Sequence, residues 1–448
     1  MTTPAKPPAT PTYILRGHAA PIHALQIFHN NLRLVSGDAD GWIVVWDLVF
    51  KRPVAVWKAH EGAVLEVKGF TVGTSKDQTE IYTHGRDHKL RVWRFRAQDE
   101  EILQRTLPVD VDERVSNAQS KDQSGSQPWL VHSLPVNALN FCAFSMLVLP
   151  PDLNGRQDGS AEDRHGETPP PSSALIAVPN ALDSGAIDLF NLPRERRICT
   201  IPTDPSVKTG MVMAANLINS PTGDIYVAAA YEDGHVMVFR CRGVLSNKTL
   251  SDIDTSANWK WTKLYTSRPH TQPVLSIDVS PSREYFLSSS ADAVLAKHPM
   301  PGLGGSKGPT DAPLKSINTK HAGQQGVRIR DDGKIFATAG WDCRVRVYSC
   351  KTMKELAVLK WHKEGCYAVA FASVVTTPTV AEGVTGVEAE ADTEPQSRQE
   401  ENEESAVVQR EKSNSLAQVQ HQRNLKVANT HWLAAGSKDG KISLWDIY

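Results

Sequence analysis

The sequence of 448 residues predicts an all-β fold, a propeller of seven four-stranded blades in a closed ring. Three observations predict it. A tight turn followed by a short alternating strand and an aromatic residue recurs along the chain. A histidine followed by an apolar strand precedes most of these copies. The copies are also regularly spaced, as units of a repeat architecture are.

The turn pattern is nearly complete near both ends of the chain. Residues 36–47 read SGDADGWIVVWD and residues 435–446 read AGSKDGKISLWD, and they align without a gap. Asp-Gly pairs favour hairpin turns because both residues tolerate positive φ, and the alternating apolar residues after them indicate strands. Each copy therefore predicts a β-hairpin.

Weaker copies fill the sequence between these two. Three of them keep a constant spacing from the turn aspartate to the aromatic residue: Asp87 to Trp93, Asp233 to Phe239 and Asp342 to Tyr348. Two are degenerate, since Ser184 replaces the aspartate before Phe190 and His298 replaces the aromatic residue after Asp292. The upstream histidines are His18, His60, His270, His321 and His362, and apolar strands are predicted after them, for example at 22–28, 64–70 and 274–279.

Two intervals between aromatic positions are about twice as long as the others, Trp93 to Phe190 and Tyr348 to Trp445. The first contains one predicted inner strand at 136–144, a middle strand at 174–178 and a third strand at 186–190, together with polar stretches at 110–128 and 151–173. The second contains a surplus at 373–428, whose Glu-rich part has too few apolar residues to form a core. We therefore predict one blade plus disordered or loop insertions in each interval, and a single seven-bladed domain over residues 1–448.

The end of the sequence predicts how the ring closes. The last hairpin finishes close to residue 448, so its blade lacks an outer strand, whereas residues 12–16 form a strand with no blade of their own. We expect residues 12–16 to pair into the last blade, because closure removes an exposed sheet edge.

The recurring polar residues are predicted to form one buried hydrogen-bond chain in each blade. A buried indole N–H needs an acceptor, and a hydroxyl can accept it while donating to an imidazole. The predicted members are His18, Ser36, Asp40 and Trp46 in blade 1, His60, Thr83, Asp87 and Trp93 in blade 2, and Asp342, Asp439 and Trp445 in later blades. A hydrolase triad uses similar residue types, but recurrence at similar offsets favours a structural role.

Composition and motifs argue against several other classes of function. Lys and Arg number 49 and Asp and Glu 50, a net charge of −1, so we expect neither direct nucleic-acid binding nor membrane binding. The six cysteines lack CxxC spacing, and His84 and His88 flank a turn with no third ligand in sight. No phosphate-binding or hydrolase motif is present. We therefore predict no catalytic residue, no cofactor and no metal.

A protein-binding surface is predicted on the rim formed by the turns before the third strands. The rim residues, one per blade, are Ala39, Arg86, Asp183, Glu232, Ala291, Trp341 and Lys438. An exposed tryptophan on a rim that also carries arginine has the composition of an interface hot spot. We predict partner binding by Trp341, Arg86, Lys438 and Glu232. Packing of Trp341 against the neighbouring turn is the alternative interpretation.

The Gly17-His18 and Trp46-Asp47 pairs at fixed offsets resemble the WD40 repeat. The whole chain resembles the ASTRA-associated WD-repeat proteins, which are related to the G-protein β-subunit-like group, on residues 13–25, 36–41, 57–60, 84–87, 339–348 and 436–446. This resemblance implies a non-enzymatic scaffold subunit of a nuclear, chromatin-linked assembly, with a cytoplasmic pool also compatible. The assembly would contain RuvB-like ATPases and kinase-maturation factors, and would support maturation of phosphatidylinositol-3-kinase-related kinases.

A second function stays open at this point. Trp93-Arg94-Phe95-Arg96 is similar to the WDxR box of substrate receptors of cullin-type ubiquitin ligases, but Arg94 stands where the box has aspartate. The alternative prediction is therefore a WD40 substrate receptor.

Overall fold

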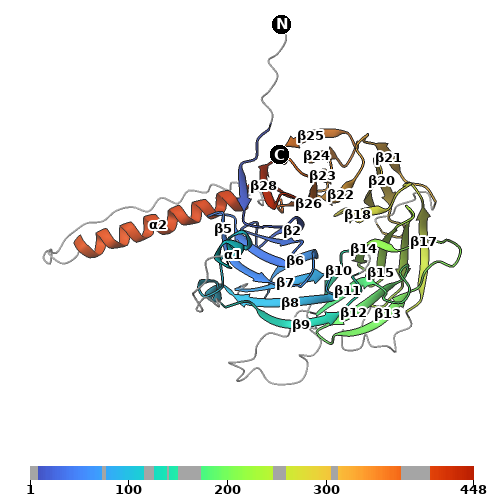
Figure 1. Ribbon diagram of the computed structural model, residues 1–448, viewed down its shortest axis with the longest axis horizontal. Coiled ribbons are helices and arrows are strands. Elements are labelled where there is room, and N and C mark those ends of the chain that lie inside the picture. Colours follow the sequence, from blue (N-terminus) through green and yellow to red (C-terminus); the bar gives the residue numbers. More distant parts are fainter. Residues whose placement is uncertain are drawn as a thin grey trace, which may run out of the picture.

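The structure, a computed structural model, describes residues 9–72, 77–115, 126–138, 141–149, 173–245, 259–303, 311–374 and 404–447. Within these residues the strands form seven four-stranded sheets, arranged as blades around a central channel (Figure 1). The predicted seven-bladed all-β propeller is confirmed.

The first four blades follow one another along the chain. Blade 1 contains β2 (Ile22–Phe28), β3 (Arg33–Asp38), β4 (Trp42–Asp47) and β5 (Arg52–Lys58). Blade 2 contains β6 (Val64–Val72), β7 (Gln78–Gly85), β8 (Lys89–Arg96) and β9 (Trp129–Pro135). Blade 3 contains β10 (Ser145–Leu149), β11 (Ser173–Pro179), β12 (Ile187–Leu192) and β13 (Arg196–Ile201). Blade 4 contains β14 (Val212–Asn219), β15 (Ile225–Tyr231), β16 (Val236–Cys241) and β17 (Trp261–Ser267).

The remaining blades complete the ring. Blade 5 contains β18 (Val274–Val279), β19 (Tyr285–Ser290), β20 (Val294–Pro299) and β21 (Lys315–Asn318). Blade 6 contains β22 (Gln324–Ile329), β23 (Ile335–Gly340), β24 (Arg344–Ser349) and β25 (Glu355–Lys360). Blade 7 contains β26 (Cys366–Phe371), β27 (Trp432–Ser437), β28 (Lys441–Asp446) and, as its outer strand, β1 (Tyr13–Arg16).

The pairing of β1 with β28 closes the ring as predicted. The strands are antiparallel, and Leu15 lies opposite Ile442. The Leu15 side chain is 1% exposed and packs in an apolar cluster shared by blades 7 and 1. One blade is thus assembled from both ends of the described chain, which leaves no open edge on β28.

Glycines on the second strands let neighbouring blades pack closely. A Cβ on Gly436 would lie 2.6 Å from a methyl carbon of Ile22 in the next blade, and a Cβ on Gly37 would lie 2.6 Å from Val64. Both distances are shorter than any real carbon contact. At these two junctions the absence of a side chain therefore lets the neighbouring blades approach closely.

The antiparallel order gives the propeller two distinct faces. The turns between second and third strands and the connections between blades lie on one face, which we call the upper face. The connections within blades, from first to second and from third to fourth strand, lie on the lower face. Apart from residues 139–140, every internal stretch outside the described residues joins strand ends of the lower face.

The inner strand of blade 3 differs from the prediction. It is β10 (Ser145–Leu149), whereas residues 136–138 belong to the connection from blade 2, where the Val136 N–H donates to the His88 carbonyl. Phe141 has a φ of 52°, a left-handed conformation that a continuous strand does not contain. The prediction of a strand at 136–144 was therefore wrong by several residues.

The insertions also contain helices, which corrects the expectation of loop or disorder. Helix α1 (Pro108–Val115) overlaps the start of the predicted 110–128 insertion, and a short 3-10 helix (Ala97–Glu101) precedes it. Helix α2 (Glu404–Ala428) occupies the end of the 373–428 insertion and projects away from the ring (Figure 1). Residues 116–125, 150–172 and 375–403 lie outside the described residues, so the prediction for those parts stays a prediction.

The base of α2 is attached to the propeller by hydrogen bonds. The Asn31 Nδ2 donates to the Ala428 carbonyl at 2.8 Å, and the Trp432 indole donates to the Val427 carbonyl at 3.1 Å. These bonds satisfy carbonyls at the helix end, which have no partner inside the helix. Good helix formers such as Lys, Gln, Leu and Ala are frequent in this segment, which is why it folds as a helix.

Candidate functional site

The hydrogen-bond chain of blade 1 is present, with one member different from the prediction. Nδ1 of His18 donates to Oδ2 of Asp38 at 2.7 Å. The Ser36 hydroxyl lies 2.7 Å from Nε2 of His18 and accepts the Trp46 indole N–H at 2.9 Å. Asp40, predicted to hold the histidine, is exposed, so its assignment is corrected to Asp38.

The position of Asp38 on the strand explains the correction. The residue at this place in blade 2 is Gly85, where a Cβ would lie 2.3 Å from the His60 ring. This position therefore faces the repeat histidine directly. The carboxylate of Asp38 contacts the imidazole from there, whereas Asp40 lies in the turn and is exposed. Oδ1 of Asp38 also accepts the backbone N–H groups of Asp40 and Trp42, which orders the turn.

Blade 2 brings together its four predicted residues. Nδ1 of His60 lies 2.8 Å from Asp87, Nε2 lies 2.8 Å from the Thr83 hydroxyl, and the Trp93 indole donates to that hydroxyl at 3.1 Å. Burial lowers the pKa of His60. Burial alone would raise the pKa of Asp87, but the hydrogen bonds and charges of His60 and Arg91 hold it below its ordinary value. Asp87 thus joins His60 and Arg91, from which it accepts hydrogen bonds at 2.8 Å each.

Blade 7 forms its network with a hydroxyl from a different strand. Nε2 of His362 lies 2.8 Å from Oγ of Ser443, which also accepts the Trp445 indole at 2.8 Å. Asp439 completes the set at 3.4 Å from Nδ1 of His362. Ala435 occupies the position of Ser36, so Ser443 on β28 supplies the missing oxygen.

Blade 5 replaces its tryptophan by a histidine and keeps the chain of bonds. Ser288 Oγ lies 2.7 Å from Nε2 of His270 and 2.8 Å from Nε2 of His298. The Tyr265 hydroxyl, 2.8 Å from Nδ1 of His298, satisfies the second ring nitrogen. Burial keeps the pKa of His298 well below its ordinary value, so this ring is neutral.

Blade 6 does not assemble the same network. Asp342 forms two hydrogen bonds with Arg346, at 2.6 and 3.1 Å, and lies 3.6 Å from Nδ1 of the exposed His321. Burial alone would raise the pKa of Asp342, but Arg346 lowers it. Asp342 thus stabilises its turn through an arginine.

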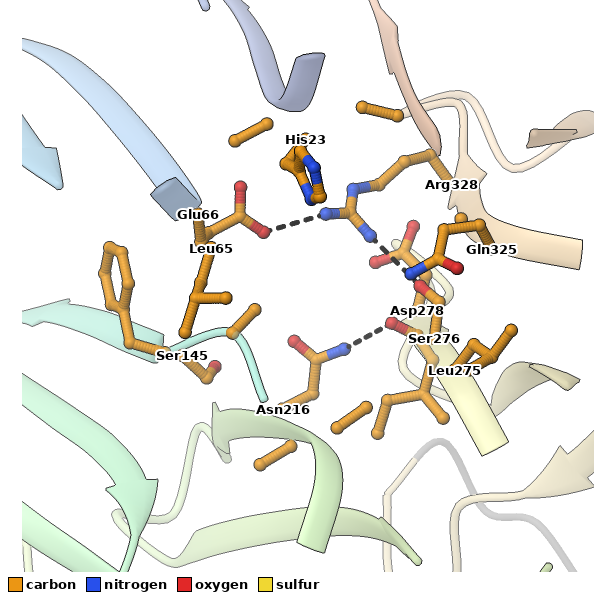
Figure 2. A pocket seen from close by; sticks show the side chains of 18 of the residues that line it. His23, Leu65, Glu66, Ser145, Asn216, Leu275, Ser276, Asp278, Gln325 and Arg328 are labelled. Carbon is orange, nitrogen blue, oxygen red and sulfur yellow. Dashed lines mark hydrogen bonds and ion pairs between the residues drawn. The ribbon is translucent and has the colours of Figure 1, made fainter. Parts of the chain in front are cut away.

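A polar cavity of about 330 Å³ lies in the central channel, and no pattern in the sequence indicates it. All seven blades contribute residues to its wall, and Figure 2 shows how Glu66 and Arg328 meet there from blades 2 and 6. Nη2 of Arg328 lies 2.9 Å from Oε2 of Glu66, and Lys68 lies 3.8 Å from the same oxygen. This pair spans 262 positions of sequence, which is why no local pattern could reveal it.

Other side chains of the channel join neighbouring inner strands. Their partners are backbone groups of the next blade: Gln26 with Gly69, Ser145 with Leu217, Asn216 with Ile277 and Asp278 with Ile329. Burial raises the pKa of Asp278 and lowers that of His23. Because these polar groups are satisfied by the protein itself, the channel holds the blades in register.

The predicted rim residues lie on the upper face, where they have different environments. Arg86 is exposed and its guanidinium lies over the Phe141 ring, 4.0 Å from the centroid. Lys438 forms a weak pair with Glu364 at 4.0 Å, and Glu232 accepts the Met211 N–H at 3.2 Å. These three and Trp341 belong to blades 2, 7, 4 and 6, so they lie on four different blades of the same face.

Trp341 is both packed and exposed, which combines the two interpretations of the sequence. A Cβ on Gly323 would lie 2.2 Å from the indole, so the ring rests directly on that glycine. Its Nε1 donates to Oε1 of Gln325 at 2.9 Å. The side chain is nevertheless 46% exposed. The ring is therefore held in one orientation while offering apolar surface to solvent.

The described residues contain neither a cluster of metal ligands nor a membrane-spanning helix. No group of three or more His, Cys, Asp or Glu side chains in them is arranged to hold a metal ion. His84 is buried and its pKa is lowered to about 3 by burial, whereas His88 is exposed. No helix among these residues is long and apolar enough to cross a membrane. Arg94, which the receptor box would have as aspartate, is bound to Glu80 at 2.6 Å.

Comparison with known proteins gives one consistent family. The family model described as ASTRA-associated protein 1 matches residues 11–445. A protein of that name from Aspergillus niger is 66% identical over 99% of this chain and 98% of its own length. The Aspergillus flavus protein is 61% identical over 100% of both chains. The Schizosaccharomyces pombe protein is 32% identical over 81% of this chain and 93% of its own.

Proposed function

The chain belongs to the ASTRA-associated protein 1 family, and we propose that it is a non-enzymatic scaffold subunit of a nuclear, chromatin-linked ASTRA-type assembly. In this proposal the assembly contains RuvB-like ATPases and supports the maturation of phosphatidylinositol-3-kinase-related kinases. The chain would supply a rigid surface that holds other protein subunits in place.

The arrangement of the upper face is the observation that carries this proposal. Trp341 is fixed by Gly323 and Gln325 and remains 46% exposed. Large aromatic side chains that are already ordered lose little conformational freedom on binding, which is why they are frequent at protein interfaces. The buried His-Ser/Thr-Trp networks below make the platform stiff.

The polar groups that resemble catalytic residues are used inside the blades. His18, Ser36 and Asp38 have the residue types of a hydrolase triad, but Ser36 already binds both His18 and Trp46. All three side chains are buried, at 5%, 0% and 0% exposure. A substrate would have to reach a serine that is enclosed in the sheet, so this geometry favours a structural role.

Affinity purification with mass spectrometry tests the scaffold proposal. The tagged chain, expressed in its own host cells, should recover RuvB-like ATPases and kinase-maturation factors from nuclear extract. Recovery of a cullin adaptor without these ATPases would instead support the substrate-receptor alternative and contradict the scaffold. Imaging of the tagged chain provides the test of nuclear location.

A further inference from the structure

Positive charge gathers on the upper face of blades 5 to 7, around Trp341. The backbone N–H of Trp341 donates to the carbonyl of Gly323, which lies in the connection from blade 5, at 3.0 Å. The Lys438 N–H donates to the carbonyl of Gly365, in the connection to blade 7, at 2.9 Å. These turns, connections and strand ends carry five cations, and together with Trp341 we call them the basic corner: Lys320, Arg344, Lys360, Lys363 and Lys438.

The carboxylates of this region are already held by other groups. Asp342 is bound by Arg346, Asp439 lies 3.7 Å from Lys441, and Glu364 lies 4.0 Å from Lys438. Asp292 lies 3.2 Å from Nδ1 of His270 and accepts the backbone N–H groups of Thr271 and Val294. Among the described residues, no carboxylate forms an ion pair with Lys320, Arg344, Lys360 or Lys363. The basic corner therefore has an excess of positive charge.

The opposite sector of the same face, on blades 3 and 4, carries charges of both signs, and its exposed cations include Lys208 and Arg268. Asp183 and Glu232 are exposed there, and neither has an ion pair with a described cation. Asp204 in this sector is already bound by Lys263. The net charge of −1 for the whole chain thus hides a local excess of positive charge on blades 5 to 7.

We propose that the basic corner binds an acidic segment of a partner protein, which places an apolar side chain against the exposed face of Trp341. This inference rests on the proposed scaffold function and adds the chemistry of the partner. Complementary charge would steer the segment to the corner, and the tryptophan would supply the central apolar contact. A long nucleic-acid strand fits less well, because its phosphates would meet Asp183 and Glu232 across the channel mouth.

Fluorescence anisotropy with a defined probe tests the proposal. The probe is a fluorescein-labelled short peptide of Asp and Glu with a central Phe, added to the purified full chain in low-salt buffer. The double variant Arg344→Glu/Lys363→Glu should weaken binding about tenfold or more, because two attractive charges become repulsive. Trp341→Ala should weaken peptide binding as well. Against the Trp341→Ala variant, a peptide with Ser in place of its Phe should bind about as weakly as the original peptide, because the contact between the two aromatic rings is already lost.

The matched control is Lys208→Glu, an exposed cation of the opposite sector, which should leave peptide binding unchanged. Equal weakening by Lys208→Glu, no detectable binding to the native chain, or tighter binding of a fluorescein-labelled single-stranded oligonucleotide would each overturn the proposal. Thermal unfolding of each variant checks that the fold is retained. The anisotropy measurement uses no other subunit, so failure of the scaffold function would appear separately, as loss of RuvB-like ATPases in the purification.

Discussion

Replacing Ser36 by alanine tests the blade networks most sharply. The Ser36 hydroxyl donates to Nε2 of His18 and accepts from Nε1 of Trp46, at 2.7 and 2.9 Å. Both partners are buried, at 5% and 2% exposure, so no water replaces the lost oxygen. An unsatisfied buried group costs about 1 to 3 kcal/mol. Two such groups predict a loss of about 2 to 6 kcal/mol in the free energy of unfolding.

Urea denaturation followed by tryptophan fluorescence and circular dichroism measures this loss, provided that the slope with denaturant is unchanged. Ser36→Thr is the matched control, because blade 2 uses Thr83 in the same place. It should keep most of the stability. Asp38→Ala should be strongly destabilising and Asp40→Ala nearly neutral, since only Asp38 holds the histidine. A loss below about 0.5 kcal/mol for Ser36→Ala would refute the reasoning.

Three further predictions concern acid stability, closure and the channel. The pKa of His84 lies below that of an unfolded histidine, so the folded state loses stability as pH falls from about 6.5 towards 3. In His84→Leu, the free energy of unfolding, measured by urea denaturation at several pH values, should therefore fall less steeply with decreasing pH. Replacement of the exposed His88 by alanine should leave this pH dependence unchanged. Leu15→Ala should lower the free energy of unfolding, measured in urea, by about 2 to 5 kcal/mol. Tyr13→Ala should lower it little, because the Tyr13 side chain is 44% exposed. Equal effects of the two variants would contradict closure by this strand. Arg328→Met removes the cross-channel pair and should cost about 1.5 to 3 kcal/mol; an unchanged unfolding midpoint would show that the pair is unimportant.

Repeated local patterns made the fold predictable. Turn aspartates, alternating apolar residues and aromatic positions recur within short windows, so blade number and order follow from the sequence. The closure by residues 12–16 followed from counting strands. The prediction failed where one residue changes the local geometry, as Phe141 does with its left-handed conformation. It also failed over 404–428, because residues with high helix propensity form a helix there although few of them are apolar.

The networks and the channel show a second limit. Spacing identified the residue types of each network but not which carboxylate reaches the histidine, because Asp38 and Asp40 differ by only two positions. In blade 7 the hydroxyl that binds the histidine belongs to Ser443 on a different strand, which spacing alone does not reveal. The pair of Glu66 and Arg328 joins blades far apart in sequence. Such contacts depend on the closed ring, so they become visible only in three dimensions.

Photo-crosslinking in cells tests the docking account most directly. With benzoylphenylalanine in place of Trp341, the account predicts crosslinks to an acidic segment of another subunit of the assembly, mapped by mass spectrometry. The same reagent in place of Leu416, which is 71% exposed on α2, should give few crosslinks to that subunit. Abundant crosslinks from α2 together with none from position 341 would contradict the account.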